Sequence, residues 1–119
     1  MRPLCPEALA GLVYKPGYNR TVYSIQATDV FETWFDGLKD RHGRARIQAR
    51  IDRAEDGNFG DCKPVGGGVS EMRIHHGAGY RVYFKQIGSE LVILLAGGDK
   101  STQASDIKTA LKLARQLEA

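Results

Sequence analysis

The feature that most constrains the fold is the stretch from Val69 to Thr102, which contains two segments of alternating polarity. Met72 and Ile74 alternate with polar residues in the first segment, and Tyr80 and Val82 do so in the second. Because a β-strand sends successive side chains to opposite faces, this alternation predicts two strands that each have one apolar face.

Two glycine-containing turns are expected to join these strands to a third. The first turn covers His76 to Gly79 and the second covers Ile87 to Glu90, with glycine where a positive φ is needed. Leu91 to Ala96 then forms an unbroken apolar run, which is typical of a strand covered on both faces. The stretch therefore predicts three adjacent antiparallel strands.

The second face of the two alternating strands gathers charged and polar groups. These groups are Glu71, Arg73, His75, Arg81, Tyr83 and Lys85. One interpretation is a solvated outer face with cross-strand ion pairs, such as Glu71 with Arg81 or Lys85, because exposed charge on one face is the usual pattern of antiparallel sheets. The other is an anion site for the phosphate groups of RNA. The two strands alone leave both interpretations open.

The rest of the chain predicts helices and one further strand. The expected elements are a strand over Thr21 to Ala27, a helix that Asp29 begins with Glu32 in capping-box register, a helix over about Arg44 to Glu55, a flexible glycine-rich loop over Asp56 to Gly68, and a final helix over about Ala104 to Leu117. This order predicts an α+β domain with its helices on one face of an antiparallel sheet and its polar face open.

The second predicted helix carries an unusual stripe of like charge. Arg46, Arg50 and Arg53 follow one another at i, i+4 and i+7, a spacing at which each pair repels by a few tenths of a kcal/mol. Such a stripe needs acidic groups beside it. We favour Asp36 and Asp40, because the two helices are expected to pack as a hairpin, and an external anion is the alternative.

Composition fits one small soluble domain. The chain has 119 residues, 42% hydrophobic and 26% charged, with a net charge of +3 that permits a nucleic-acid partner. Its two cysteines form no disulfide framework or zinc pattern, and no apolar run approaches the roughly 18 residues of a membrane span, so we expect a cytoplasmic protein without metal or cofactor. Residues 1–21 are expected to be a loosely ordered extension, with a start near Val22 as one interpretation, and residues 22–119 the domain.

Several motifs in this order resemble a known family. The combination of E-x-R, Y-R-V-Y-F and G-G-D-K-x-T-Q resembles the RelE/ParE superfamily of type II toxins, and within it the phage-derived Gp49-like, HigB-type addiction module killer proteins. The resemblance covers about Val22 to Glu118. It implies a RelE-like fold, in which an N-terminal helical hairpin and a C-terminal helix pack on a four-stranded antiparallel sheet.

The resemblance also implies an activity and partners. Such toxins are metal-independent endoribonucleases (mRNA interferases) that cut mRNA in the ribosomal A site and so inhibit translation and arrest growth. The 2′-hydroxyl attacks the neighbouring phosphate, which leaves a cyclic phosphate and a 5′-hydroxyl. A helix-turn-helix antitoxin encoded by an adjacent gene neutralises the toxin, and no small-molecule cofactor is involved.

The resemblance, together with this chemistry, gives a set of candidate site residues. Arg81 matches the arginine of the family motif that clamps the phosphate, and Arg73 and Lys100 match further cationic positions. The proton acceptor and donor stay open among Glu71, Tyr83 and His75. The groups expected to bind RNA phosphates are Lys63, His75, Lys85, Arg46 and Arg50.

One departure from the family pattern keeps other functions open. Many ribonuclease members carry a tyrosine or histidine near the C-terminus, but no aromatic residue or histidine follows Phe84 in this chain. The corresponding segment reads Ser105-Asp106-Ile107. The alternatives are a ParE-like poison of DNA gyrase that does not cut RNA, and a catalytically inactive module that binds RNA or a protein partner.

Overall fold

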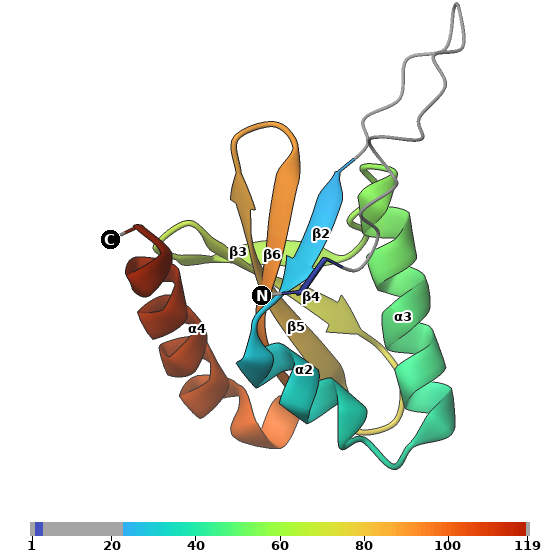
Figure 1. Ribbon diagram of the computed structural model, residues 1–119. Helices are drawn as coiled ribbons and strands as arrows, with labels where there is room; N and C mark the ends of the chain where they lie inside the picture. The colour runs from blue at the N-terminus through green and yellow to red at the C-terminus, as the bar shows by residue number, and fades with distance from the viewer. Residues whose placement is uncertain (1, 4–22, 119) are drawn as a thin grey trace, which may run out of the picture.

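The computed structural model describes residues 2–3 and 23–118 (Figure 1). Its elements are β1 (Arg2–Pro3), β2 (Ser24–Ala27), α2 (Asp29–Asp36), α3 (Arg41–Glu55), β3 (Cys62–Gly66), β4 (Val69–Ile74), β5 (Tyr80–Ile87), β6 (Leu91–Gly98), the 3₁₀ turn η1 (Lys100–Thr102) and α4 (Gln103–Glu118). Apart from β1, which pairs with β2, the predicted extension over residues 1–21 lies outside the described residues.

All the described strands form one mixed sheet in the order β1-β2-β6-β5-β4-β3. The three strands predicted from Val69 onward are confirmed, and Gly77, Gly79 and Gly88 adopt the positive φ that their turns require. The expectation of a four-stranded antiparallel sheet was wrong, because six described strands form the sheet and β2 runs parallel to β6. Two helices and three strands separate β2 from β6 in the sequence. The alternation of side chains within one strand does not indicate the direction of the strand beside it.

The glycine-rich segment expected to be a flexible loop contains an edge strand. Within it, Cys62–Gly66 forms β3, which pairs antiparallel with β4 and has an irregularity between Pro64 and Gly66. Proline lacks an N–H donor and is therefore tolerated at an edge, where one side of the strand has no partner. Because this segment contains a proline and several glycines, it lacks the residue pattern that predicts a strand. The strand nevertheless lies directly beside the candidate site.

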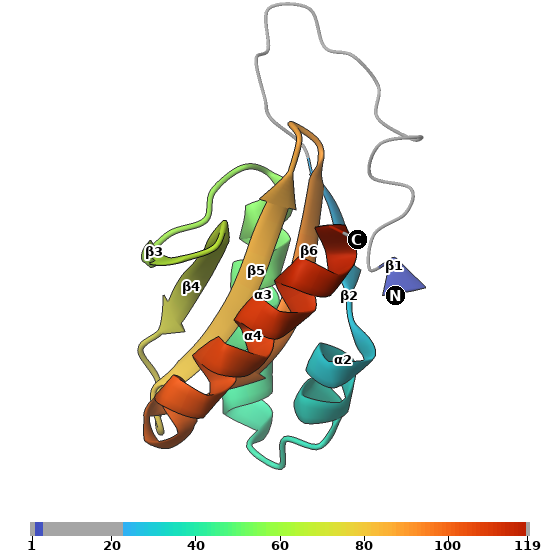
Figure 2. The ribbon, with the colours of Figure 1, turned by 90° about the vertical axis from the view of Figure 1, so that its left-hand side faces the viewer.

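The helices cover both faces of the sheet, so the expectation of one open face was wrong. On β6, Val92 and Leu94 belong to the core cluster beneath α2 and α3, whereas Ile93 and Leu95 belong to a second cluster beneath α4. The apolar run of β6 had indeed predicted a strand covered on both faces. Figure 2 shows α4 running across β5 and β6, with β3 and β4 to one side of it.

Local signals explain where the two N-terminal helices begin. Thr28, and not Asp29 as predicted, is the N-cap of α2: its hydroxyl accepts a hydrogen bond from the Phe31 N–H at 3.2 Å and donates one to the Leu95 carbonyl at 2.6 Å. In α3, Asp40 is the N-cap and accepts from the Gly43 N–H at 2.9 Å. The Thr28 bonds fix the start of α2 against β6. Asp40 places the start of α3 beside the first residue of β5, Tyr80, whose hydroxyl donates to it.

The two apolar clusters fill the space between the sheet and its helices. The cluster on the α2 and α3 side includes Phe31, Ile47, Ile51, Met72, Val82 and Phe84, and the cluster on the α4 side includes Tyr83, Ile93, Leu95, Ala110 and Ala114. None of the helices within residues 23–118 has the length and apolar composition that crossing a membrane would take.

Candidate functional site

Two arginines on adjacent strands form the centre of the candidate site. Arg73 on β4 and Arg81 on β5 are paired directly opposite each other, so both side chains leave the sheet on the same face. Their exposure differs: 33% of the Arg73 side chain is exposed but only 11% of the Arg81 side chain. The sequence therefore placed the pair correctly, but Arg81 does not lie on an open surface as expected.

A buried carboxylate holds Arg81 in place. Glu71 is fully buried, and its Oε1 lies 3.7 Å from Nη1 of Arg81. Its Oε2 accepts hydrogen bonds from the Tyr83 hydroxyl at 3.1 Å and from the Gln103 amide of α4 at 2.8 Å. The cross-strand ion pair between Glu71 and Arg81 is thus present, and it ties the sheet arginine to the first residue of α4.

Tyr83 is unsuited to releasing its proton near neutral pH. Its side chain is fully buried, and burial together with the adjacent Glu71 carboxylate raises the pKa of Tyr83 well above its ordinary value. The hydroxyl therefore stays protonated and donates to Glu71. Glu71 and Tyr83 were predicted on an exposed face, and both are instead covered.

Replacing Tyr83 with phenylalanine is expected to flatten the alkaline loss of stability. Because the folded protein holds this proton more tightly than the unfolded chain, the free energy of unfolding falls as pH rises above the ordinary tyrosine pKa of about 10. The variant lacks this ionisation. Urea unfolding at several pH values from about 9 to 11 measures the effect. Parallel stability profiles for the two proteins would contradict the assignment.

An acidic residue that sequence reasoning missed connects the exposed side of the site. Asp61 accepts from Nη2 of Arg73 at 2.8 Å and lies 2.5 Å from Nε2 of His75, whose side chain is 71% exposed. These two contacts, that of His75 first, lower the pKa of Asp61 below its usual value. The backbone N–H of Arg73 also donates to the Asp61 carbonyl. Asp61 directly precedes β3, so recognising that strand as the partner of β4 would have placed Asp61 beside Arg73.

Arg50 of α3 reaches the same region by way of backbone groups. Its Nη1 donates to the Arg73 carbonyl at 2.6 Å, and its Nη2 donates to the carbonyls of Phe59 at 2.9 Å and Asp61 at 3.3 Å. The predicted pairing with Asp40 was wrong, because that carboxylate caps α3 and accepts from the Tyr80 hydroxyl at 2.8 Å. Asp36 also makes no ion pair with Arg50 among the described residues. Burial lowers the pKa of Arg50.

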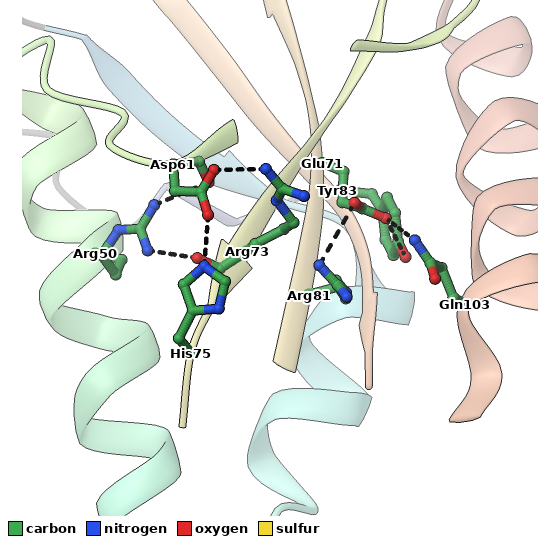
Figure 3. A network of polar contacts seen from close by, with 8 residues as sticks. All are labelled: Arg50, Asp61, Glu71, Arg73, His75, Arg81, Tyr83 and Gln103. Atoms are coloured by element: carbon green, nitrogen blue, oxygen red, sulfur yellow. Dashed lines mark hydrogen bonds and ion pairs between the residues drawn. The ribbon is translucent and has the colours of Figure 1, made fainter. Parts of the chain in front are cut away.

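Figure 3 shows these groups as one row that runs from α3 to α4 across the end of the sheet. The row contains Arg50, Asp61, His75, Arg73, Arg81, Glu71, Tyr83 and Gln103. The remaining predicted cations lie around it. Lys63 and Lys100 are exposed, Lys85 is half-buried, and Arg46 is exposed on α3. The structure thus brings together most, but not all, of the predicted site residues.

The fold is similar to that of a bacterial toxin. A solved structure of E. coli toxin RelE in the free state, in which two arginines are replaced by alanine, matches with a TM-score of 0.55 and 13% sequence identity. The match covers 73% of this chain and 96% of the other. At this identity the likeness establishes a RelE-like fold, which confirms that part of the sequence prediction.

The sequence relatives then define the family. The family model for Phage derived protein Gp49-like (DUF891) matches residues 33–117, which is well over half of the chain. An uncharacterized protein of Haemophilus influenzae strain Rd is 53% identical over 93 residues, which span 78% of this chain and 94% of the relative. The chain therefore belongs to the phage-derived Gp49-like family, as its motifs predicted.

Proposed function

We propose that this protein is the toxin of a type II toxin–antitoxin system and acts as a metal-independent, ribosome-dependent mRNA endoribonuclease. The Gp49-like family and the RelE-like fold support the toxin class. The observation that carries the enzymatic proposal is the direct cross-strand pairing of Arg73 with Arg81 on one face of that fold. Two guanidinium groups so placed suit a phosphodiester that gains negative charge during cleavage.

The proposed reaction is a transesterification within the RNA strand. The RNA 2′-hydroxyl loses its proton as it attacks the adjacent phosphorus, the bond to the 5′-oxygen breaks, and that oxygen takes up a proton, so that a 2′,3′-cyclic phosphate and a 5′-hydroxyl result. With Glu71 and Tyr83 fully buried, the exposed His75 is the candidate for these proton transfers. Arg81 stabilises the charge on the non-bridging oxygens, and Arg73 binds the same phosphate from its more exposed position. Exposed Lys63 and Lys100, with half-buried Lys85, hold neighbouring phosphates.

The buried polar groups have a positioning role in this proposal. Glu71 and Tyr83 are out of reach of RNA because both are fully buried. Glu71 instead fixes the guanidinium of Arg81, and Tyr83 and Gln103 fix Glu71 through hydrogen bonds. On the exposed side, Asp61 orients Arg73 and His75 in the same way. Bound RNA then shares Arg73 with Asp61.

Primer extension on total RNA after induction of the protein in growing cells tests the proposal. We expect new 5′ ends inside translated codons, and we expect none in cells that also express a helix-turn-helix antitoxin from the adjacent gene. These new 5′ ends should be absent from a matched culture treated with a translation inhibitor, because the proposed cleavage requires mRNA on a translating ribosome. Growth arrest with intact mRNA would exclude the ribonuclease.

The gyrase-poison alternative is retained for one specific reason. No aromatic residue or histidine follows Phe84, so the C-terminal group that many ribonuclease members carry is missing. A gyrase supercoiling assay with purified protein separates the two functions. Inhibition of supercoiling without cleavage of mRNA would favour the gyrase poison, and neither activity would favour the inactive binding module.

A further inference from the structure

A pocket of about 250 Å³ lies between α3 and the end of β4. Its lining residues are Arg46, Ala49, Arg50, Arg53, Ile74 and His75. Three of the six are arginines from one helix face, and a fourth is a largely exposed histidine. At about 30 Å³ for each water molecule in the liquid, the pocket has room for a group several times larger than one water.

The positive charge of this pocket has little compensation. Arg46 and Arg53 are exposed, and within residues 23–118 neither guanidinium makes a side-chain hydrogen bond or an ion pair. Arg50 donates to backbone carbonyls, which satisfy its N–H groups but carry no net charge. The Asp61 carboxylate, which contacts the pocket residue His75, is already shared by Arg73 and His75.

Elimination of the internal partners leaves an external anion as the explanation of the arginine stripe. Like charges at i, i+4 and i+7 repel. Of the two acidic groups expected beside them, Asp40 is used by Gly43 and Tyr80 instead, and Asp36 makes no ion pair with Arg50 among the described residues. Planar guanidinium groups match the oxygens of a phosphate better than a point charge does. Ile74 and Ala49 add an apolar patch of the kind that a sugar ring can contact.

We propose that this pocket binds a backbone phosphate of single-stranded RNA, next to the linkage held by Arg73 and Arg81. The inference rests on the proposed function for the identity of the ligand. Arg46 and Arg53 contact the phosphate, and His75 closes the pocket on the side of the sheet. Arg50 forms its rigid wall, because three backbone carbonyls fix that side chain.

The structure connects this pocket to the arginine pair through short links. Arg50 donates to the Arg73 carbonyl, and Asp61 bridges the side chains of His75 and Arg73 (Figure 3). An RNA strand that crosses from α3 to β5 therefore meets Arg46 and Arg53 first, then His75, and then Arg73 and Arg81. The pocket would set the direction and register of the strand relative to the scissile bond.

The test compares two double variants that lose the same charge. Arg46→Gln/Arg53→Gln alters the pocket without touching Arg50, whose hydrogen bonds support the loop before β3. Arg41→Gln/Arg44→Gln removes two arginines from the opposite side of the same helix, since residues on a helix advance by about 100° each. The probe is a fluorescein-labelled 2′-O-methyl oligonucleotide, which cannot be cleaved. Fluorescence anisotropy at several salt concentrations gives its affinity for the full chain.

We expect the pocket variant to bind the probe on the order of 10-fold or more weakly than the wild type. The slope of log affinity against log salt should become shallower by about 0.7, the value for one lost phosphate contact to a single strand. The control variant should change both quantities much less. Equal losses of affinity in the two variants would overturn the proposed phosphate site, because the loss of positive charge alone would explain them. Absence of probe binding by the wild-type protein would also overturn it.

A parallel measurement separates this inference from the proposed function. The NMR signals of the His75 ring should shift on titration with inorganic phosphate in the wild type and not in the pocket variant. If these signals shift but the protein cuts no mRNA in cells, the pocket stands and the ribonuclease fails. If the protein cuts mRNA but the pocket variant binds the probe as the wild type does, the pocket fails alone.

Discussion

Replacing Arg81 with alanine is expected, under the proposed ribonuclease function, to lower the rate of mRNA cleavage by ~10²–10³-fold, because this change removes the group proposed to stabilise charge in the transition state. Induction of the variant should then leave growth almost unaffected at an expression level where the wild type arrests it. The measurements are the growth rate after induction and the yield of cut mRNA by primer extension, each normalised to the amount of soluble protein.

The position of Arg81 demands a control for folding. Removal of the Arg81 cation leaves the fully buried Glu71 carboxylate without its ion-pair partner. Breaking a buried ion pair in this way costs about 3–5 kcal/mol of stability in well-studied cases. Glu71→Gln/Arg81→Ala removes both charges and should regain stability without regaining activity. Arg81→Lys keeps the charge but lacks the planar guanidinium, so it should fold well and cleave poorly. Full toxicity of the double variant would exclude the phosphate role of Arg81.

Replacing Gly97 with alanine is expected to destabilise the fold by ~1–3 kcal/mol, the usual cost of overpacking. A Cβ atom at Gly97 would overlap with ring carbons of Trp34, which lies against this residue because glycine has no side chain. Trp34 also contacts Tyr80, so its displacement would disturb the start of β5 close to Arg81. Thermal unfolding measures the loss, at about 4 °C for each kcal/mol in a domain of this size.

A double-mutant cycle identifies the cause of that loss. Trp34→Leu alone should also destabilise the protein, because it removes a large apolar ring from the core. If the clash is the reason, Gly97→Ala/Trp34→Leu should lose clearly less than the sum of the two single changes, since the smaller side chain leaves room for the methyl group. Additive losses would show that Gly97 matters for its backbone and not for its contact with Trp34.

Periodicity predicted the strands well and their arrangement poorly. The alternation of Tyr80 and Val82 with polar residues identified β5, and the continuous apolar run identified β6 as covered on both faces. That second inference already implied a helix on each side, yet the sheet was expected to have one open face. The parallel pairing of β2 with β6 depends on contacts between distant segments, which no local pattern encodes.

The candidate site was predictable where it depends on register and unpredictable where it depends on backbone atoms. Glycine turns fixed the pairing of β4 with β5, so Arg73 and Arg81 could be expected to lie side by side. The hydrogen-bond partners of Arg50 could not be predicted, because they are three backbone carbonyl oxygens that any residue could supply. Asp61 was missed because its neighbour β3 contains proline and glycine and shows no strand pattern.

The placement of β6 between β2 and β5 has a consequence for how the polypeptide is made. Of the strands from β2 to β6, β2 leaves the ribosome first and its partner β6 leaves last, so their pairing closes a long loop late. A nascent chain that stops before Leu91 has no central strand and leaves the apolar edges of β2 and β5 open to aggregation. Synthesis itself therefore delays formation of the complete sheet until β6 has been joined, and a chain that terminates before Leu91 cannot form it.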